Sequence, residues 1–326
     1  MRETCIKMIG ELAKTDERVV FIGSDLSPGL LKDMKAAYPD RHYMEGVYEQ
    51  NIIGMAAGLA MDGYIPYVNT IATFITRRCY EQIAIDICMH KLPVRLIGNG
   101  GGVVYAPLGP THLATEDISL MRALPNMTVV SVCDADEMVR FMKETIAWPH
   151  PIYIRLGKGY DEVVSVEGVP FEIGKVIKMH QTASIGKMNI LLISTGVMTQ
   201  RALKLAKALE ELCVNVTVLH AHTVKPLDEE AILHHAKISQ LVVTLEEHTL
   251  IGGLGSAVTD LLVEEMGTQM PLTKRFALPD RFPEKYGSQE LILDYYGLSP
   301  EKLFAALSEL LHAQFSAYLR TEKSVA

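Results

Sequence analysis

Short apolar runs of strand length alternate with segments of helical period in the first half of the chain. The runs are bounded by Gly, Pro, Asp or Asn and cover residues 18–22, 65–69, 93–97, 127–132 and 152–156. Between two of them, residues 50–61 carry an apolar stripe at the i, i+3, i+4 spacing of one helix face. Strands that alternate with helices are typical of parallel sheets. The pattern therefore predicts a parallel sheet with helices on both faces.

The alternation stops near residue 160 and begins again near residue 188. The segment between is rich in Gly and Pro and has no sustained period, which is typical of a connection between domains. The second block has predicted strands at 189–194, 214–219 and 240–245 and predicted helices at 199–212, 228–236 and 253–265. We therefore predict two tandem α/β domains, residues 1–160 and 188–326, joined by a linker at 161–187.

Capping residues mark two further helix starts. Asp134 is followed three residues later by Glu137, which is the spacing of a capping box. Ser299 precedes Pro300, and Ser at the N-cap with Pro at the first helical position favours a helix start there.

The charge balance and the cysteines exclude several classes of function. The 326 residues carry a net charge of −8 with scattered Lys and Arg, so we expect no nucleic-acid partner and no anionic membrane surface. No apolar run approaches the ~18–20 residues of a membrane span, and no secretory signal follows the first residues. Five cysteines without a C-x-x-C pair favour free thiols over disulfides or a zinc site. We expect a cytoplasmic protein with no metal site of its own.

Two glycine-rich stretches have to be weighed as phosphate-binding loops. The stretch at 98–102 follows a predicted strand, but it lacks the third glycine of G-x-G-x-x-G and is followed by a poor helix start. The stretch at 252–255 does precede a predicted helix, although small residues at such turns usually serve close packing. We favour a structural role for both.

Three segments contain residues suited to catalysis or binding, and none is decisive alone. Glu49 stands just before the apolar helix, where a first-turn acid is also expected from the helix dipole. His112 follows a Gly-Pro turn that would present it to a cleft, although a lone loop histidine is usually structural. Phe74 precedes the pair Arg77-Arg78, for which core packing and a solvated face are the simpler interpretations.

Taken in order, these segments resemble the pyrimidine-binding domain of transketolase. The matching series is Gly-Ser-Asp-Leu at 23–26, Tyr-Glu-Gln-Asn at 48–51, Phe74 with Arg77-Arg78, Gly-Pro-Thr-His at 109–112 and Leu-Pro-Asn-Met at 124–127. The second block resembles the transketolase C-terminal domain through Ser-Thr-Gly at 194–196, Val-Lys-Pro-Leu-Asp at 224–228, Glu-Glu-His at 246–248 and the glycines at 252–255. The resemblance covers nearly the whole chain but only the back two-thirds of a full-length transketolase.

The resemblance implies that the chain binds the pyrimidine end of thiamine diphosphate. Glu49 matches the glutamate that hydrogen-bonds the aminopyrimidine nitrogen, a role that needs a carboxyl shielded from water. Phe74 matches an aromatic residue that packs on the pyrimidine, and Asp25 matches an aspartate near the pyrimidine and thiazolium. Ile71 and Arg77 stand where the family has two further aromatic residues of the pyrimidine pocket.

The same resemblance assigns the substrate contacts and reveals two departures. His112 matches a catalytic histidine that faces the substrate oxygens. Lys158 falls where the family has a phosphate-binding arginine, although a lysine lacks the bidentate fork, and Arg2 is a second possible phosphate contact. Leu108 replaces an aspartate that reads a sugar hydroxyl, and Gly100 replaces a substrate-facing histidine. We therefore expect intact cofactor activation beside an altered sugar pocket.

The sequence contains no Gly-Asp-Gly motif, and this absence indicates a partner chain. In the family that motif belongs to the front domain, which binds the cofactor's diphosphate through Mg²⁺. The main hypothesis is thus the C-terminal subunit of a two-chain transketolase, which transfers a two-carbon ketol unit from a ketose phosphate to an aldose. We expect a homodimer alone and an α2β2 assembly with an N-terminal-half partner.

Three alternatives remain open at this stage. The β subunit of a 2-oxoacid dehydrogenase shares the domain order and length but has a different segment in place of Gly-Pro-Thr-His. Deoxyxylulose-phosphate synthase shares that segment but is normally one long chain. A regulatory subunit that kept the fold and lost turnover would be consistent with Leu108 and Gly100, but not with the retention of Glu49, Phe74 and His112.

Overall fold

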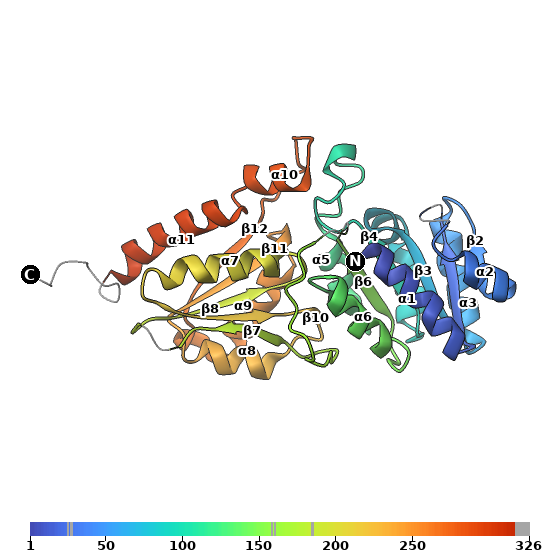
Figure 1. The fold of residues 1–326 in the computed structure, drawn as a ribbon, viewed down its shortest axis with the longest axis horizontal. Coiled ribbons are helices and arrows are strands. Elements are labelled where there is room, and N and C mark those ends of the chain that lie inside the picture. Colours follow the sequence, from blue (N-terminus) through green and yellow to red (C-terminus); the bar gives the residue numbers. More distant parts are fainter. Residues whose placement is uncertain (25, 27–28, 158, 160, 184–185, 317–326) are drawn as a thin grey trace, which may run out of the picture.

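Two sheets, each covered by helices on both faces, form the protein (Figure 1). The computed structural model describes residues 1–24, 26, 29–157, 159, 161–183 and 186–316. No helix formed by these residues is both long enough and apolar enough to cross a membrane.

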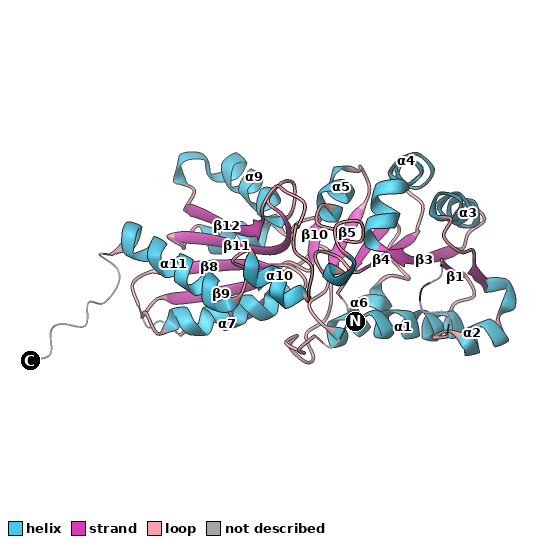
Figure 2. Ribbon diagram, turned by 90° about the horizontal axis from the view of Figure 1, so that it is seen from above, coloured by secondary structure: helices cyan, strands magenta, loops and turns pink. Residues whose placement is uncertain are grey.

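The first sheet has seven strands in the order β10-β5-β6-β4-β3-β1-β2. Its strands are β1 (Val19–Gly23), β2 (His42–Met44), β3 (Ile65–Ile71), β4 (Arg95–Asn99), β5 (Thr128–Ser131), β6 (Ile152–Leu156) and β10 (Thr223–Lys225). The helices of this domain are α1 (Arg2–Thr15), α2 (Lys32–Ala37), α3 (Glu49–Met61), α4 (Tyr80–Gln82), α5 (Asp117–Ala123) and α6 (Ala135–Glu144). The helices α3, α4 and α5 lie on one face of the sheet, and α1 and α6 lie on the other (Figure 2).

The second sheet has five strands in the order β12-β11-β8-β9-β7. These are β7 (Ile177–Gln181), β8 (Asn189–Ser194), β9 (Asn215–His220), β11 (Leu241–Thr249) and β12 (Leu272–Leu278). The helices are α7 (Met198–Glu210), α8 (Glu229–Ala236), α9 (Leu254–Met266), α10 (Gln289–Tyr295) and α11 (Pro300–Phe315). Leucines of α7 and α11 pack in one cluster beneath this sheet, while α9 packs on the opposite face.

The predicted fold class is confirmed. The five strands predicted in the first half are β1, β3, β4, β5 and β6, and each neighbouring pair among them is parallel. The predicted apolar stripe is buried as a whole and packs α3 onto the sheet; its members are Ile52, Ile53, Ala56, Ala57 and Ala60. Asp134 caps α6 through the N–H groups of Asp136 and Glu137, although the Glu137 carboxylate accepts from Cys133 N–H rather than from Asp134.

Four strands lie where the sequence analysis predicts none: β2, β7, β10 and β12. Strand β7 lies inside the predicted linker and pairs antiparallel with β9. Strand β10 lies in the second half of the chain, yet it pairs antiparallel with β5 of the first sheet. All four are at the edge of a sheet, where a continuous apolar run is not required.

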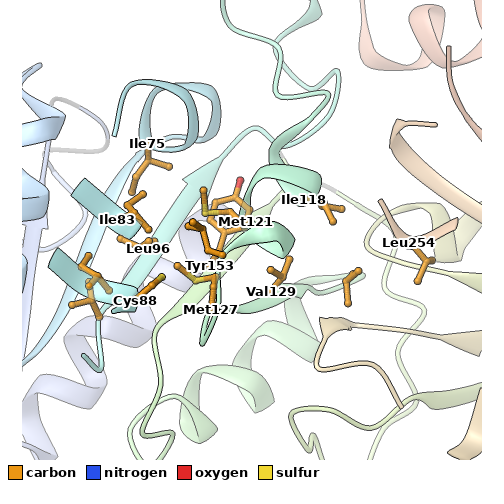
Figure 3. Close-up of a cluster of buried hydrophobic side chains, with 14 of the residues drawn as sticks. Ile75, Ile83, Cys88, Leu96, Ile118, Met121, Met127, Val129, Tyr153 and Leu254 are labelled. Carbon is orange, nitrogen blue, oxygen red and sulfur yellow. The ribbon is translucent and has the colours of Figure 1, made fainter. Parts of the chain in front are cut away.

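The two domains share one apolar core. A single cluster of buried side chains extends from Ile75 and Leu96 of the first domain to Leu254 of the second, as Figure 3 shows. A buried polar contact adds to it, because His220 Nε2 lies 2.9 Å from Glu137 Oε2. His220 Nδ1 lies 2.7 Å from Thr199 Oγ1, so both ring nitrogens have protein partners. The described cysteines are free, as expected, and Cys133 lies beside this contact.

His222 lies at the same domain contact and is fully buried. Its ring centroid is 3.9 Å from that of Phe171, and its carbonyl accepts a hydrogen bond of 2.7 Å from Ser131 N–H. Burial lowers the pKa of His222 to about 3, with Glu137 opposing and His220 adding to the shift. The unfolded chain therefore takes up a proton near pH 6.5 that the folded chain does not.

This difference predicts a pH-dependent stability. His222 destabilises the fold progressively as the pH falls below about 6.5, by up to about 1.4 kcal/mol per pH unit. Relative to wild type, His222→Gln should gain about 2 kcal/mol in unfolding free energy between about pH 7.5 and pH 5. Urea titrations at both pH values measure this, with His90→Gln as an exposed control. An unchanged pH slope in His222→Gln would contradict the assignment.

Candidate functional site

The carboxyl ends of β1, β3 and β4 form the edge at which the candidate residues gather. These strands are neighbours in the sheet and run parallel, so the segments that follow them meet at one edge. In open α/β sheets this edge is where ligands bind. Buried polar side chains already line it: Asn99 Nδ2 donates to Asn69 Oδ1 at 2.7 Å and to the carbonyl of Thr70 at 2.8 Å.

Glu49 is the first residue of α3 and is almost completely buried, with a side-chain exposure of 2%. Its Oε1 accepts a hydrogen bond of 3.2 Å from Thr70 Oγ1, and its Oε2 accepts one of 3.2 Å from Arg78 Nη1. An acid that served only the helix dipole would gain as much at the surface, without the cost of losing its water. Burial therefore favours a functional interpretation of Glu49.

Phe74 and Arg78 stand at the two ends of a short π-type helix, residues 74–78. The Arg78 Cζ atom lies 4.0 Å from the centroid of the Phe74 ring, which is cation–π geometry. The Phe74 ring also makes an edge contact with the ring of His112, with centroids 5.3 Å apart. Glu49, Phe74 and His112 come from distant segments and are connected through these contacts.

The loop that carries His112 turns sharply at Gly109, whose φ of +78° favours glycine. His112 is half-buried, and its Nδ1 lies 2.9 Å from the hydroxyl of Thr111. The ring also makes an edge contact with Phe74, and the rest of the side chain is partly exposed to solvent.

Arg77 pairs with a different acidic residue from the one that Arg78 contacts. It forms an ion pair with Glu116, and its Nη2 donates to the carbonyl of Leu113 at 3.0 Å. Ile71 is half-buried at the end of β3. The cofactor-binding roles of Ile71 and Arg77 stay predictions, and the structure ties Arg77 to the 113–116 segment rather than to Glu49.

Three further predicted cofactor- and substrate-binding residues are only partly placed. Asp25 and Lys158 lie outside the described residues. Arg2 begins α1, and its role as a phosphate contact stays a prediction.

Both departures from the transketolase pattern have structural counterparts. Leu108 is 53% exposed and lies in the short helical turn 106–108. Gly100 has a φ of +77°, and the ring of Tyr105 lies directly over its Cα, in the space a side chain would need. Sequence reasoning missed Tyr105, because four residues separate it from Gly100 and no motif marks it.

The two glycine-rich stretches do not form free anion-binding sites. The N–H groups of Gly100 and Gly101 both donate to the carbonyl of Leu156, at 3.0 and 2.9 Å. At the start of α9, the N–H groups of Leu254 and Gly255 donate to the buried carboxyl of Glu246. Burial raises the pKa of Glu246 to about 7. The structural interpretation of both stretches is confirmed.

The sequence of the chain matches known protein families. Residues 1–160 match the transketolase pyrimidine-binding domain, and residues 184–303 match the transketolase C-terminal domain. The chain is 38% identical over 306 residues to the transketolase family protein y4mN of Sinorhizobium fredii, covering 93% of this chain and 86% of that protein. The chain belongs to the transketolase family.

Two further relatives have nearly the same extent as this chain. The 6-deoxy-6-sulfo-D-fructose transketolase subunit SqwH of Clostridium sp. is 32% identical over 311 residues, which are 95% of this chain and 94% of that protein. A solved split gene transketolase, described as an inactive beta4 tetramer, is 35% identical with a TM-score of 0.84. The alignment covers 95% of this chain and 97% of that one.

The packing of Tyr105 over Gly100 predicts a stability effect. Gly100→Ala should lose about 2–3 kcal/mol of unfolding free energy, because the positive φ is strained for alanine and Tyr105 must move. Gly63→Ala is the matched control, since Gly63 also has a positive φ, +92°, but has open space where a Cβ would stand, so it should lose only about 1 kcal/mol. Urea unfolding measures both changes. Equal effects would show that Tyr105 does not occupy this space.

Proposed function

We propose that this chain is the C-terminal subunit of a two-chain transketolase that depends on thiamine diphosphate. The reaction is the transfer of a two-carbon ketol unit from a ketose phosphate to an aldose. The single observation that best supports the proposal is the buried carboxyl of Glu49, whose partner Arg78 stacks on Phe74, the ring that in turn contacts His112. Family membership alone would fit a regulatory subunit equally well.

The residues present fit the pyrimidine ring of this cofactor. An aminopyrimidine needs a hydrogen-bonding carboxyl at its ring nitrogen and an apolar surface for its flat face. Glu49 supplies the first and Phe74 the second, with Ile71 at the border of the pocket. When bound, thiamine diphosphate would supply the carbon–carbon chemistry, for which no amino-acid side chain is suited.

The proposed roles of the side chains follow from their positions. Glu49 shares a proton with the ring nitrogen in a site from which water is excluded, where a hydrogen bond is stronger than in water. His112 lies at the solvent border of the pocket, where it hydrogen-bonds the reacting oxygens of the substrate. Arg2 and Lys158, with Asp25 nearer the cofactor, complete the proposed site.

The proposed partner is an N-terminal-half subunit. The chain has no Gly-Asp-Gly motif, so the diphosphate and its Mg²⁺ are assigned to that subunit. Support comes from the split gene transketolase, which is described as an inactive beta4 tetramer. We infer that this chain forms a homodimer alone and an α2β2 assembly with the partner.

We propose that the substrate is an anionic ketose. The protein's contacts to the sugar differ from the usual ones of the family. Leu108 offers no hydrogen-bonding group, and the ring of Tyr105 fills the place of a side chain at Gly100. The name of the Clostridium relative specifies a sulfonated ketose as the substrate of that protein. A screen of donors should therefore include both a phosphorylated and a sulfonated ketose.

Replacing Glu49 tests the proposed function. Glu49→Gln keeps the size of the side chain but cannot share a proton in the same way, so turnover by the reconstituted pair should fall by roughly 10²–10⁴-fold. The measurement is the rate of ketol transfer with saturating thiamine diphosphate and Mg²⁺, and Glu81→Gln on α4 is an exposed acid control. Undiminished turnover in Glu49→Gln would rule out this role.

A further inference from the structure

Arg78 contacts the same two side chains that the proposed function assigns to the pyrimidine ring. Its Nη1 donates to Glu49 Oε2 at 3.2 Å, and its Cζ lies 4.0 Å from the centroid of Phe74. The two contacts are made by one planar group, with one edge toward the carboxylate and one face on the aromatic ring.

A guanidinium group and an aminopyrimidine ring present similar chemistry to such a pocket. Both are planar and both stack on aromatic faces. The guanidinium donates N–H groups to Glu49, and the ring nitrogen donates one when it holds the proton that it shares with Glu49. Glu49 Oε2 and the face of Phe74 can contact only one of these two groups, the guanidinium or the aminopyrimidine ring, at a time. The two groups therefore compete for one place.

Without a partner for Glu49, the buried carboxylate would be costly. Thr70 is a neutral donor, and an ionised carboxyl with an exposure of 2% needs an opposite charge to balance the water it has lost. The neighbouring cation cannot supply it, because Arg77 is held by Glu116 and the carbonyl of Leu113. Arg78 is the positive charge in contact with Glu49 among the described residues.

Arg78 is also free to leave. Its side chain is 39% exposed, so one side of it faces water, whereas the Glu49 side chain is 2% exposed. The group that replaces Arg78 therefore has to balance the Glu49 carboxylate in its turn. The pocket can thus exchange Arg78 for another planar donor without breaking the protein core.

We propose that Arg78 is a positioning residue that occupies the place of the aminopyrimidine in the cofactor-free chain and must swing out when the ring binds. The inference rests on the proposed function. It predicts that this chain alone binds the cofactor weakly, since the ring must displace an internal competitor. A partner that holds the diphosphate raises the local concentration of the ring and so favours the exchange.

The test measures binding of the isolated pyrimidine, which needs neither the partner nor turnover. The 326-residue chain is titrated with 4-amino-5-hydroxymethyl-2-methylpyrimidine, and the Kd is obtained by ligand-observed NMR. Arg78→Gln, which removes the charge and the competing plane, should bind the probe roughly 3- to 30-fold more tightly than wild type. Arg78→Lys, which keeps the charge but not the plane, should lie between the two.

Two controls separate this role from a general effect on structure. Arg41 also stacks on an aromatic ring, with its Cζ 4.0 Å from the centroid of Tyr38, but lies away from Glu49. Arg41→Gln should leave the Kd unchanged. In a Glu49→Gln background, the tightening produced by Arg78→Gln should be lost, because the competition acts through that carboxylate.

The outcomes distinguish the inference from the function on which it rests. Wild-type binding that depends on Glu49, together with an unchanged or weaker affinity in Arg78→Gln, would overturn the role of Arg78 and leave the proposed function standing. Weaker affinity would show that Arg78 holds the ring instead of competing with it. Absence of Glu49-dependent binding in every variant would count against the proposed function itself.

Discussion

A carboxylate that has lost its water must find compensating partners, and this constraint governs the arrangement around Glu49. The first turn of α3 places the side chain between the sheet and the 74–78 helix, where Thr70 and Arg78 bond its two oxygens. Burying a charge in this way costs free energy that the fold does not recover from packing. Such a cost is more readily understood at a binding site than as a contribution to stability.

The fold brings this carboxylate to its neighbours through simple rules of parallel sheets. Neighbouring strands β1, β3 and β4 end at the same edge, so polar segments that are far apart in sequence meet there. The second domain contributes to this edge indirectly. Its strand β10 extends the first sheet, and Glu247 accepts a hydrogen bond of 2.7 Å from Val103 N–H, which anchors the start of the loop that leads to His112.

The sequence was sufficient to predict much of the fold and only part of the site. The buried stripe on α3 and the central strands were predictable, because burial on one or both faces imposes a regular apolar pattern. The edge strands β2, β7, β10 and β12 were not, because edge pairing depends on backbone hydrogen bonds that need no particular side chains. The motifs singled out Glu49, Phe74 and His112, and the structure connects all three through direct or shared contacts. The contact between Glu49 and Arg78 spans 29 residues, and no local spacing signals it. Tyr105 over Gly100 was hidden for the same reason, since loop conformation decides it.

The most direct test of this account is a crystal structure of the chain with its partner subunit and thiamine diphosphate. The account predicts that a Glu49 carboxyl oxygen lies within hydrogen-bonding distance of the pyrimidine nitrogen, about 2.6–3.2 Å, with the ring on Phe74 and Arg78 turned toward solvent. A complex in which Glu49 keeps its pair with Arg78 while the ring binds elsewhere would contradict it.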